Sequence, residues 1–76
     1  MSSITHISSS GEFSRLLSSN THVITDFYAD WCGPCKAIAP TFEKLAKEHS
    51  RKGKIAFAKV DVDSQQEIAQ KYGVSA

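Results

Sequence analysis

The sequence predicts an α/β fold in which parallel strands alternate with helices. Two apolar runs rich in β-branched and aromatic residues, at 22–28 and 55–60, are typical of buried strands. Helical patterns precede, separate and follow these runs, so the predicted order is strand, helix, strand, helix, strand, helix, joined by right-handed crossovers. At 76 residues the chain has room for one small domain.

The amino-terminal stretch is rich in serine but is not of low complexity. Residues 4–7 form a candidate short edge strand. Phe13, Leu16 and Leu17 then recur at spacings of three and four, which places them on one face of a helix. We expect Ser10 or another serine to cap this helix.

The strand at 22–28 contains one charged residue, Asp26, and its apolar pattern predicts burial on both faces. A longer helix follows, with residues at helical spacing: Ile38, Phe42, Leu45 and His49. We expect the three apolar members of this set to pack in the core. Pro40 lies inside the helix and removes the bond to the carbonyl of Lys36, which predicts a kink.

The last third of the chain predicts the strand at 55–60 and a short helix. Asp63, followed three residues later by Gln66, resembles a capping box at the start of that helix. Tyr72 and Gly73 mark its expected end.

Composition excludes several classes of function. The chain is 41% hydrophobic and 22% charged, which is typical of a globular protein. A net charge of +1 is too small to predict a nucleic-acid partner. The apolar runs are far shorter than the roughly 20 residues that cross a membrane, and no basic segment leads into an apolar signal, so we expect a cytoplasmic protein.

The two cysteines are the candidate reactive groups. In Trp31-Cys32-Gly33-Pro34-Cys35 the thiols stand three residues apart at the start of a helix, close enough for a disulfide to open and close. The first cysteine faces unpaired N–H groups and the positive end of the helix dipole, which favour its thiolate, so we expect it to attack. The second lies further into the helix, and we expect it to resolve the mixed disulfide.

Other uses of this cysteine spacing are less consistent with the sequence. Haem attachment requires His after the second cysteine, and Lys36 stands there. A zinc site requires four ligands, whereas His6, His22 and His49 are separated and no second cysteine pair exists, so no metal is expected within one chain. A metal site shared by two chains stays open, as does a pair of ordinary core cysteines.

Residues 26–36 (DFYADWCGPCK), followed by Ile38-Ala39-Pro40, resemble the active-site strand and helix of the thioredoxin family. Residues 58–63 and 71–74 resemble later blocks, so the resemblance covers nearly the whole chain. It implies a thiol-disulfide oxidoreductase that reduces disulfides in client proteins and contributes to cell redox homeostasis. It also implies no bound cofactor, because NADPH acts indirectly, through a thioredoxin reductase.

The resemblance assigns roles to single residues. Cys32 resembles the nucleophile, Cys35 the resolving thiol and Trp31 the aromatic that flanks the site. Asp26 resembles a buried carboxylate that accepts the proton of the resolving cysteine, and burial in an apolar strand favours proton uptake by a carboxylate. Alternatively, Asp26 is only paired with Lys59, which resembles the family's partner lysine. The motif's remaining site-shaping residues are Gly33, Pro34 and Pro40.

Family members continue beyond the block that matches Val74-Ser75-Ala76 with a cis-proline loop, two antiparallel strands and a last helix. We therefore expect residues 1–76 to form a single incomplete thioredoxin-like domain, a βαβαβα unit that lacks the ββα unit. The strand at 22–28 would become an edge, which favours self-association or strand exchange. An amino-terminal interaction module of a longer protein, with secondary or no redox activity, stays open as an alternative.

Overall fold

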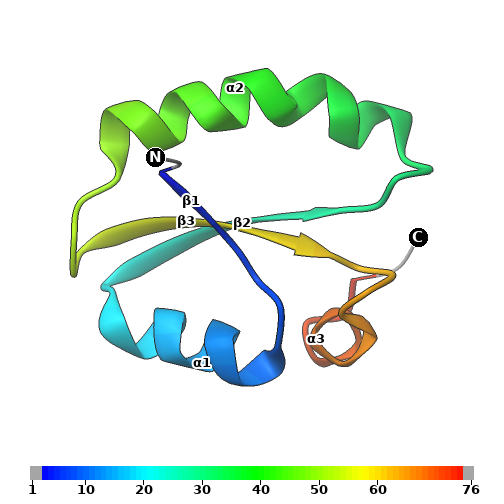
Figure 1. Cartoon of the computed structure of the whole chain (residues 1–76), viewed down its shortest axis with the longest axis horizontal. Coiled ribbons are helices and arrows are strands. Elements are labelled where there is room, and N and C mark those ends of the chain that lie inside the picture. Colours follow the sequence, from blue (N-terminus) through cyan, green and yellow to red (C-terminus); the bar gives the residue numbers. More distant parts are fainter. Residues whose placement is uncertain (1–2, 75–76) are drawn as a thin grey trace.

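The computed structural model describes residues 3–74, in which one sheet lies between two layers of helices (Figure 1). The elements follow in the order β1 (Ile4–His6), α1 (Ser10–Ser19), β2 (His22–Tyr28), α2 (Gly33–His49), β3 (Ile55–Asp61) and α3 (Gln66–Lys71). The strands are parallel and lie in the order β1-β3-β2. Helix α2 covers one face, and α1 and α3 cover the other. The predicted order and the parallel sheet are confirmed.

Helix α1 begins at a serine cap. Ser9 Oγ accepts a hydrogen bond from the backbone N–H of Glu12 at 3.1 Å. Glu12 Oε1 in turn accepts the backbone N–H of Ser8 at 2.6 Å and its hydroxyl at 3.1 Å. These bonds lower the pKa of Glu12, because they stabilise its charged carboxylate. The cap is therefore one residue earlier than Ser10, and the arrangement is close to a capping box.

The face under α1 and α3 holds an apolar core. Its buried members are Ile7, Phe13, Ala58, Val60 and Ile68, with Leu16, Val23 and Phe27 packed against them. Val60 is fully buried because β3 is the central strand. The predicted apolar face of α1 is confirmed for Phe13 and Leu16, whereas Leu17 is 38% exposed.

The predicted core face of α2 is only partly correct. Phe42 is buried and packs against Phe57, with ring centroids 5.5 Å apart. Ile38 and Leu45, however, are 50% and 42% exposed. The buried side of the helix rests on β1 and β3, through the cluster of Ile4, Phe42, Ala46 and Phe57. Within residues 3–74, no element covers the flank that carries Ile38 and Leu45.

Strand β2 is an edge strand of the described sheet. It pairs with β3 over its whole length, from His22 opposite Ile55 to Tyr28 opposite Asp61. The apolar pattern predicted burial on both faces, and this is wrong, because Ile24 is 45% exposed. The edge position expected from the family resemblance is confirmed.

Helix α3 begins without the predicted side-chain cap. Its N-cap is Gln65, whose side chain makes no capping hydrogen bond. The carboxylate of Asp63 instead accepts a hydrogen bond from Trp31, and Asp61 Oδ1 accepts the backbone N–H of Asp63 at 2.9 Å. Gly73, at φ +70°, adopts the left-handed conformation that glycine favours after a helix.

Candidate active site

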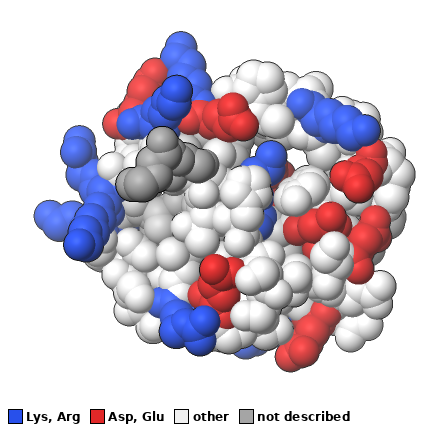
Figure 2. Space-filling model, viewed as in Figure 1, with Lys and Arg blue, Asp and Glu red and all other residues white. Residues whose placement is uncertain are grey.

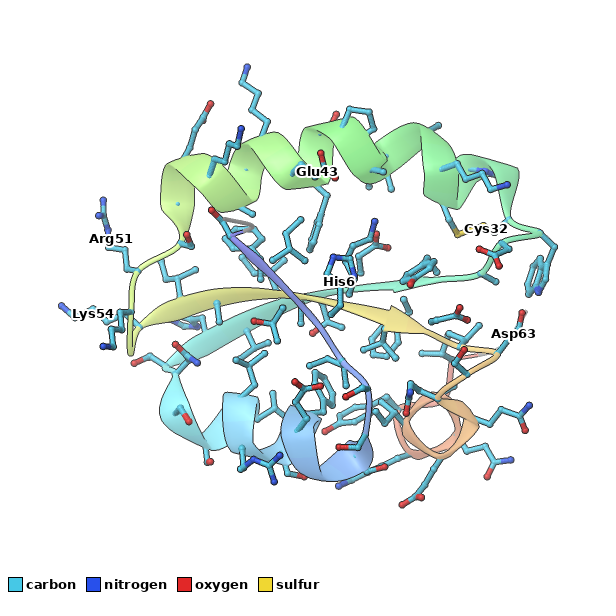
Figure 3. All side chains as sticks on the ribbon, in the orientation of Figure 1. His6, Cys32, Glu43, Arg51, Lys54 and Asp63 are labelled. Carbon is cyan, nitrogen blue, oxygen red and sulfur yellow. A yellow bond between two sulfur atoms is a disulfide. The ribbon has the colours of Figure 1, made fainter. Side chains whose placement is uncertain are left out.

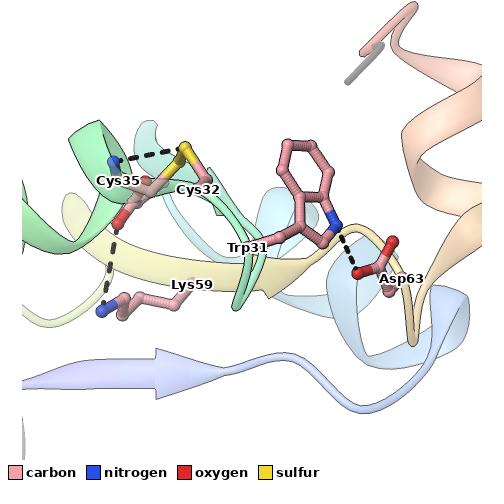
Figure 4. Close-up of a disulfide and its surroundings, with 6 residues drawn as sticks. Trp31, Cys32, Cys35, Lys59 and Asp63 are labelled. Carbon is pink, nitrogen blue, oxygen red and sulfur yellow. Dashed lines mark hydrogen bonds and ion pairs between the residues drawn. A yellow bond between two sulfur atoms is a disulfide. The ribbon is translucent and has the colours of Figure 1, made fainter.

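The candidate site is the disulfide between Cys32 and Cys35 at the start of α2 (Figure 4). Cys32 is the N-cap of the helix and Cys35 lies in its first turn, with 5.3 Å between their Cα atoms. The backbone N–H of Cys35 donates to Cys32 Sγ at 3.3 Å. Pro34 lies in the same turn, where its missing N–H removes no helical bond. A side chain at position 33 would meet no described residue beyond its neighbours in the chain and the backbone of its own helix, so the turn is open on that side.

The helix start offers electrostatic stabilisation to the Cys32 sulfur. Once the disulfide is reduced, the Cys35 N–H remains a donor to that sulfur, and the helix dipole favours negative charge there. Cys35 is attached deeper in the helix, and within residues 3–74 no N–H group donates a hydrogen bond to its sulfur. This asymmetry is what a nucleophile and a resolving thiol require, and the two roles stay predictions.

Trp31 flanks the disulfide and is 59% exposed. Its Nε1 donates to Asp63 Oδ2 at 2.8 Å, which ties the segment before α2 to the turn after β3 (Figure 4). Sequence reasoning did not identify this bond, because the partners stand 32 positions apart and Asp63 was expected to act as a helix cap. Beside them lies a cavity of about 140 Å³ whose wall includes Trp31, both cysteines, Val62 and Val74.

Asp26 and Lys59 form a charged pair on the sheet face under α2. The strand register puts them opposite each other, and Lys59 Nζ lies 3.9 Å from Asp26 Oδ2, as the dashed line at Lys59 in Figure 4 marks. Both side chains are largely buried, with 12% of Asp26 exposed. Among the residues that the structure describes, Asp26 Oδ2 has no hydrogen-bond partner, since the 3.9 Å to Lys59 Nζ is too long for a hydrogen bond. A buried carboxylate oxygen left in this state is costly and is more typical of functional sites than of structural pairs.

Tyr28 completes the group on this face, and sequence reasoning did not predict its part. Lys59 Nζ stands 5.0 Å from the centroid of the Tyr28 ring. Burial raises the pKa of Tyr28, and the negative charges of Asp61, Asp30 and Asp26 raise it further. The signal in the sequence was the spacing of two between Asp26 and Tyr28, which puts both side chains on one face of a strand.

A second cavity lies between Cys35 and Lys59, the cation of this charged pair. It measures about 220 Å³, and Cys35, Tyr28 and Lys59 contribute to its wall. This volume has room for several water molecules, at about 30 Å³ each in the liquid. Pro40 lines neither this cavity nor the one beside Trp31, so its expected influence is on the helix and not on the sulfurs.

Charged side chains divide between the two ends of the sheet. Arg51 and Lys54 lie at the end away from the disulfide, whereas Cys32 and Asp63 lie at the other (Figure 3). In the same orientation, Figure 2 shows most of the blue Lys and Arg over the first end and most of the red Asp and Glu over the second, although a blue side chain also lies at the upper right and red ones at the upper left. The net charge of +1 therefore conceals a site that lies at the acidic end of the molecule.

No metal centre accompanies the cysteines in the part of the chain that the structure describes. Between residues 3 and 74, no three or more His, Cys, Asp or Glu side chains are grouped so that they could hold a metal ion. His6, His22 and His49 lie on three different elements. A metal shared between two chains is a separate arrangement, which a single chain does not test.

The sequence model of the family described as Thioredoxin matches residues 4–76. The chain belongs to the thioredoxin family. A thioredoxin of Neurospora crassa is 55% identical over 73 residues, which are 96% of this chain and 58% of that protein. The chain therefore spans less than two thirds of the length of this curated relative.

Solved thioredoxin structures share the fold. The thioredoxin of Plasmodium falciparum matches with a TM-score of 0.86 at 40% identity, over 95% of this chain and 68% of that one. Mitochondrial thioredoxin 3 of Saccharomyces cerevisiae, solved in its oxidised form, matches with a TM-score of 0.84 at 39% identity, over 97% of this chain and 67% of that one. The thioredoxin-like fold predicted for the chain is thereby confirmed.

Proposed function

We propose that this chain reduces disulfide bonds in other proteins by thiol-disulfide exchange. The single observation that carries the proposal is the Cys32–Cys35 disulfide at the start of α2, with the Cys35 N–H donating to the Cys32 sulfur. Membership of the thioredoxin family supports the same activity. The carboxylate of Asp26, paired with Lys59 on the wall of the cavity beside Cys35, is a candidate acceptor for the proton that the resolving step releases.

The proposed reaction has two exchange steps. The Cys32 thiolate attacks one sulfur of a client disulfide, so a Cys32–client bond forms while the client bond breaks and its second sulfur leaves and takes up a proton. Cys35 then gives up its proton and attacks the Cys32 sulfur, which closes the Cys32–Cys35 disulfide and releases the client's first sulfur. The client gains two electrons and two protons, and the chain is left oxidised.

Asp26 is the proposed acceptor of the Cys35 proton. Its buried Oδ2 has a free lone pair, and the cavity of about 220 Å³ beside Cys35 gives water room to carry the proton. Lys59, whose Nζ lies 3.9 Å from the same carboxylate oxygen, also contributes to the wall of that cavity and so connects the acceptor to the space beside Cys35.

Trapping of clients tests the exchange chemistry. With Cys35→Ser, the mixed disulfide has no resolving thiol, so client proteins should stay bound to Cys32 and be released by a reductant. Cys32→Ser and the double variant are the matched controls, which should trap nothing. Equal capture by the double variant would support non-covalent docking, the alternative function of an interaction module, and would overturn the exchange proposal.

Replacement of Asp26 tests its role separately. Asp26→Asn keeps the shape of the side chain but removes the acceptor, so we expect the release of a Cys32-bound client to slow about 10-fold or more near pH 7. The rate of the first attack, by Cys32, should change much less, and stopped-flow fluorescence resolves the two steps. An unchanged release rate would remove Asp26 from the mechanism.

The proposal includes a reductase partner and a compartment. A thioredoxin reductase that uses NADPH would re-reduce the Cys32–Cys35 disulfide, and NADPH consumption with insulin as the client measures this cycle directly. None of the helices between residues 3 and 74 is long and apolar enough to span a bilayer. Cysteine usage favours the cytoplasm, while the family also includes mitochondrial proteins, so cell fractionation is the test of location.

A second copy of the chain is a further proposed partner. Strand β2 presents an unpaired edge in the described sheet, and Ile24, Ile38 and Leu45 are exposed nearby. Such an edge favours pairing with another strand. Size-exclusion chromatography with light scattering at micromolar concentration should show dimers or larger species, and a clean monomer would contradict this partner.

A further inference from the structure

We propose that Tyr28 is a positioning residue whose ring holds the Lys59 ammonium against the Asp26 carboxylate. By holding it there, Tyr28 would set the pH range in which Asp26 can accept a proton. This inference rests on the proposed function for its biological meaning, but the contact itself can be tested without any client.

The three side chains meet on the sheet face under α2. Asp26 and Lys59 are register partners, and Tyr28 lies two residues further along β2, so all three project to the same side. Lys59 Nζ lies 3.9 Å from Asp26 Oδ2 and 5.0 Å from the centroid of the Tyr28 ring. The ammonium group is therefore shared between a carboxylate and an aromatic face.

The ring is needed because the carboxylate alone does not fix the ammonium group. At 3.9 Å the ion pair includes no hydrogen bond, so it imposes little direction on a flexible side chain. The neighbouring cavity of about 220 Å³ offers Lys59 space to turn away from Asp26. A cation within about 6 Å of an aromatic centroid is attracted to the ring face, and partial burial strengthens that attraction.

The hydroxyl of Tyr28 is not expected to take part. Burial raises the pKa of Tyr28, and so do Asp61, Asp30 and Asp26, so the phenol stays neutral well above pH 7. The ring thus acts through its face, and the neutral phenol adds no charge to the pair. This separates the proposal from one in which Tyr28 donates or accepts a proton.

Several other groups could influence the titration of Asp26. From β2 and the segment after it come Tyr28 and Asp30, and from β3 come Lys59 and Asp61. Helix α2 contributes Cys35 and Lys36 to the cavity wall, and His6 of β1 pairs with Lys59 in the sheet register. Keeping the disulfide oxidised removes the cysteines from the titration, and residue-specific assignment separates the remaining groups.

The test follows the Asp26 side-chain carboxyl carbon by NMR as the pH is varied, in the oxidised full chain. The variants are Tyr28→Leu, which removes the ring, Tyr28→Phe, which keeps it, and Lys59→Met, which removes the cation. We expect Tyr28→Leu to move the Asp26 titration midpoint to higher pH by about 0.5–1 unit, towards that of Lys59→Met. Tyr28→Phe should stay within about 0.2 unit of the unchanged protein, and adding Tyr28→Leu to Lys59→Met should produce little further shift, because the ring acts through the ammonium group.

Three results would overturn the inference. The first is a Tyr28→Leu midpoint equal to that of the unchanged protein while Lys59→Met is shifted. The second is an equal shift in Tyr28→Phe and Tyr28→Leu, which would assign the effect to the hydroxyl. The third is no shift in Lys59→Met, which would show that the ammonium group does not act on Asp26.

The same variants distinguish a folding defect from a loss of the positioning effect, and failure of the proposed function from failure of this inference. Where Tyr28→Leu fails to give a folded spectrum, Tyr28→Met and Tyr28→Trp replace the Leu and Phe variants, with the same expected contrast between no ring and a ring. Insulin reduction is measured in parallel. Loss of reductase activity with an intact Tyr28 effect counts against the proposed function alone, and the reverse result counts against the positioning role alone.

Discussion

The two faces of the sheet differ in what they bury. The face under α1 and α3 buries Ile7, Phe13, Ala58, Val60 and Ile68, and none of this cluster is charged. The face under α2 has an apolar half around Phe42 and Phe57, and a polar half in which Asp26 and Lys59 lie near the disulfide. Burial of apolar groups stabilises the first face, whereas burial of a carboxylate without a hydrogen bond destabilises part of the second.

The difference between the two faces shows where the fold tolerates the destabilising burial of a charged group. Charged groups on the α1 and α3 face would interrupt the core that holds the helices to β3, the central strand. On the opposite face, the first turn of α2 carries Cys32 and Cys35, and a proton acceptor is useful only beside those sulfurs. The cost is therefore confined to the end of the sheet that carries the disulfide, where the proposed exchange would take place.

The largest effect is expected for a cavity in the apolar face. Phe13→Ala should lower the free energy of unfolding by about 3–5 kcal/mol, which is comparable to the whole stability of a small domain. Leu17→Ala, in the same helix but at a much more exposed position than Phe13, is the matched control, and should cost less than about 1 kcal/mol. Urea unfolding followed by circular dichroism measures both. Similar losses in the two variants would show that this face does not hold the fold together.

A smaller contrast is expected along α2. Phe42→Ala should cost about 3 kcal/mol, because its ring packs on Phe57. Ile38→Ala, at a position that is 50% exposed, should cost less than about 1 kcal/mol in this chain. If Ile38→Ala proves as costly as Phe42→Ala, then the flank of α2 is covered in solution, and unfolding measured at several protein concentrations would identify self-association as the cause.

The success of the sequence predictions depended on how local the information was. The extent of strand β2 and the position of the cysteines at a helix start were predicted correctly, because the content of β-branched and aromatic residues and the position of Pro34 act within a few residues. Burial of Ile38 and Leu45 was predicted wrongly, since a helical spacing identifies an apolar face but not whether another element covers it. The helical spacing of these residues in α2 was predicted correctly, but the sequence pattern did not show which element, if any, packs against them.

Contacts between side chains of different elements could not be predicted from the sequence for a related reason. The Trp31–Asp63 hydrogen bond and the contact of Lys59 with Tyr28 each join residues from different elements. They depend on the strand register, which places Asp26 opposite Lys59. The pairing of Asp26 with Lys59 was considered only through the family resemblance, and the part of Tyr28 required the register itself.

Acid should weaken the capped end of the α1 face. The pKa of Glu12 lies below its ordinary 4.5 because Ser8 donates to its carboxylate, so the folded state releases this proton more readily than the unfolded state. The stabilisation is present above pH 4.5 and is lost as the pH falls through the lowered pKa. Urea midpoints of the unchanged protein and of Glu12→Gln should therefore converge between pH 6 and pH 3. Parallel profiles would show that the cap does not contribute.

High pH should lower the free energy of unfolding through Tyr28 on the α2 face. The effect should be smaller still, because Tyr28 is partly exposed to water. The pKa of Tyr28 is raised above 10.0, first by burial and then by Asp61, Asp30 and Asp26, so the folded state keeps a proton that the unfolded state loses. Stability from this group is present below pH 10 and declines as the pH rises through the raised pKa. Tyr28→Phe should remove the decline in urea midpoints between pH 9 and pH 11, and Asp30→Asn should remove a part of it. A decline that persists in Tyr28→Phe would assign the alkaline sensitivity to other groups, such as the lysines.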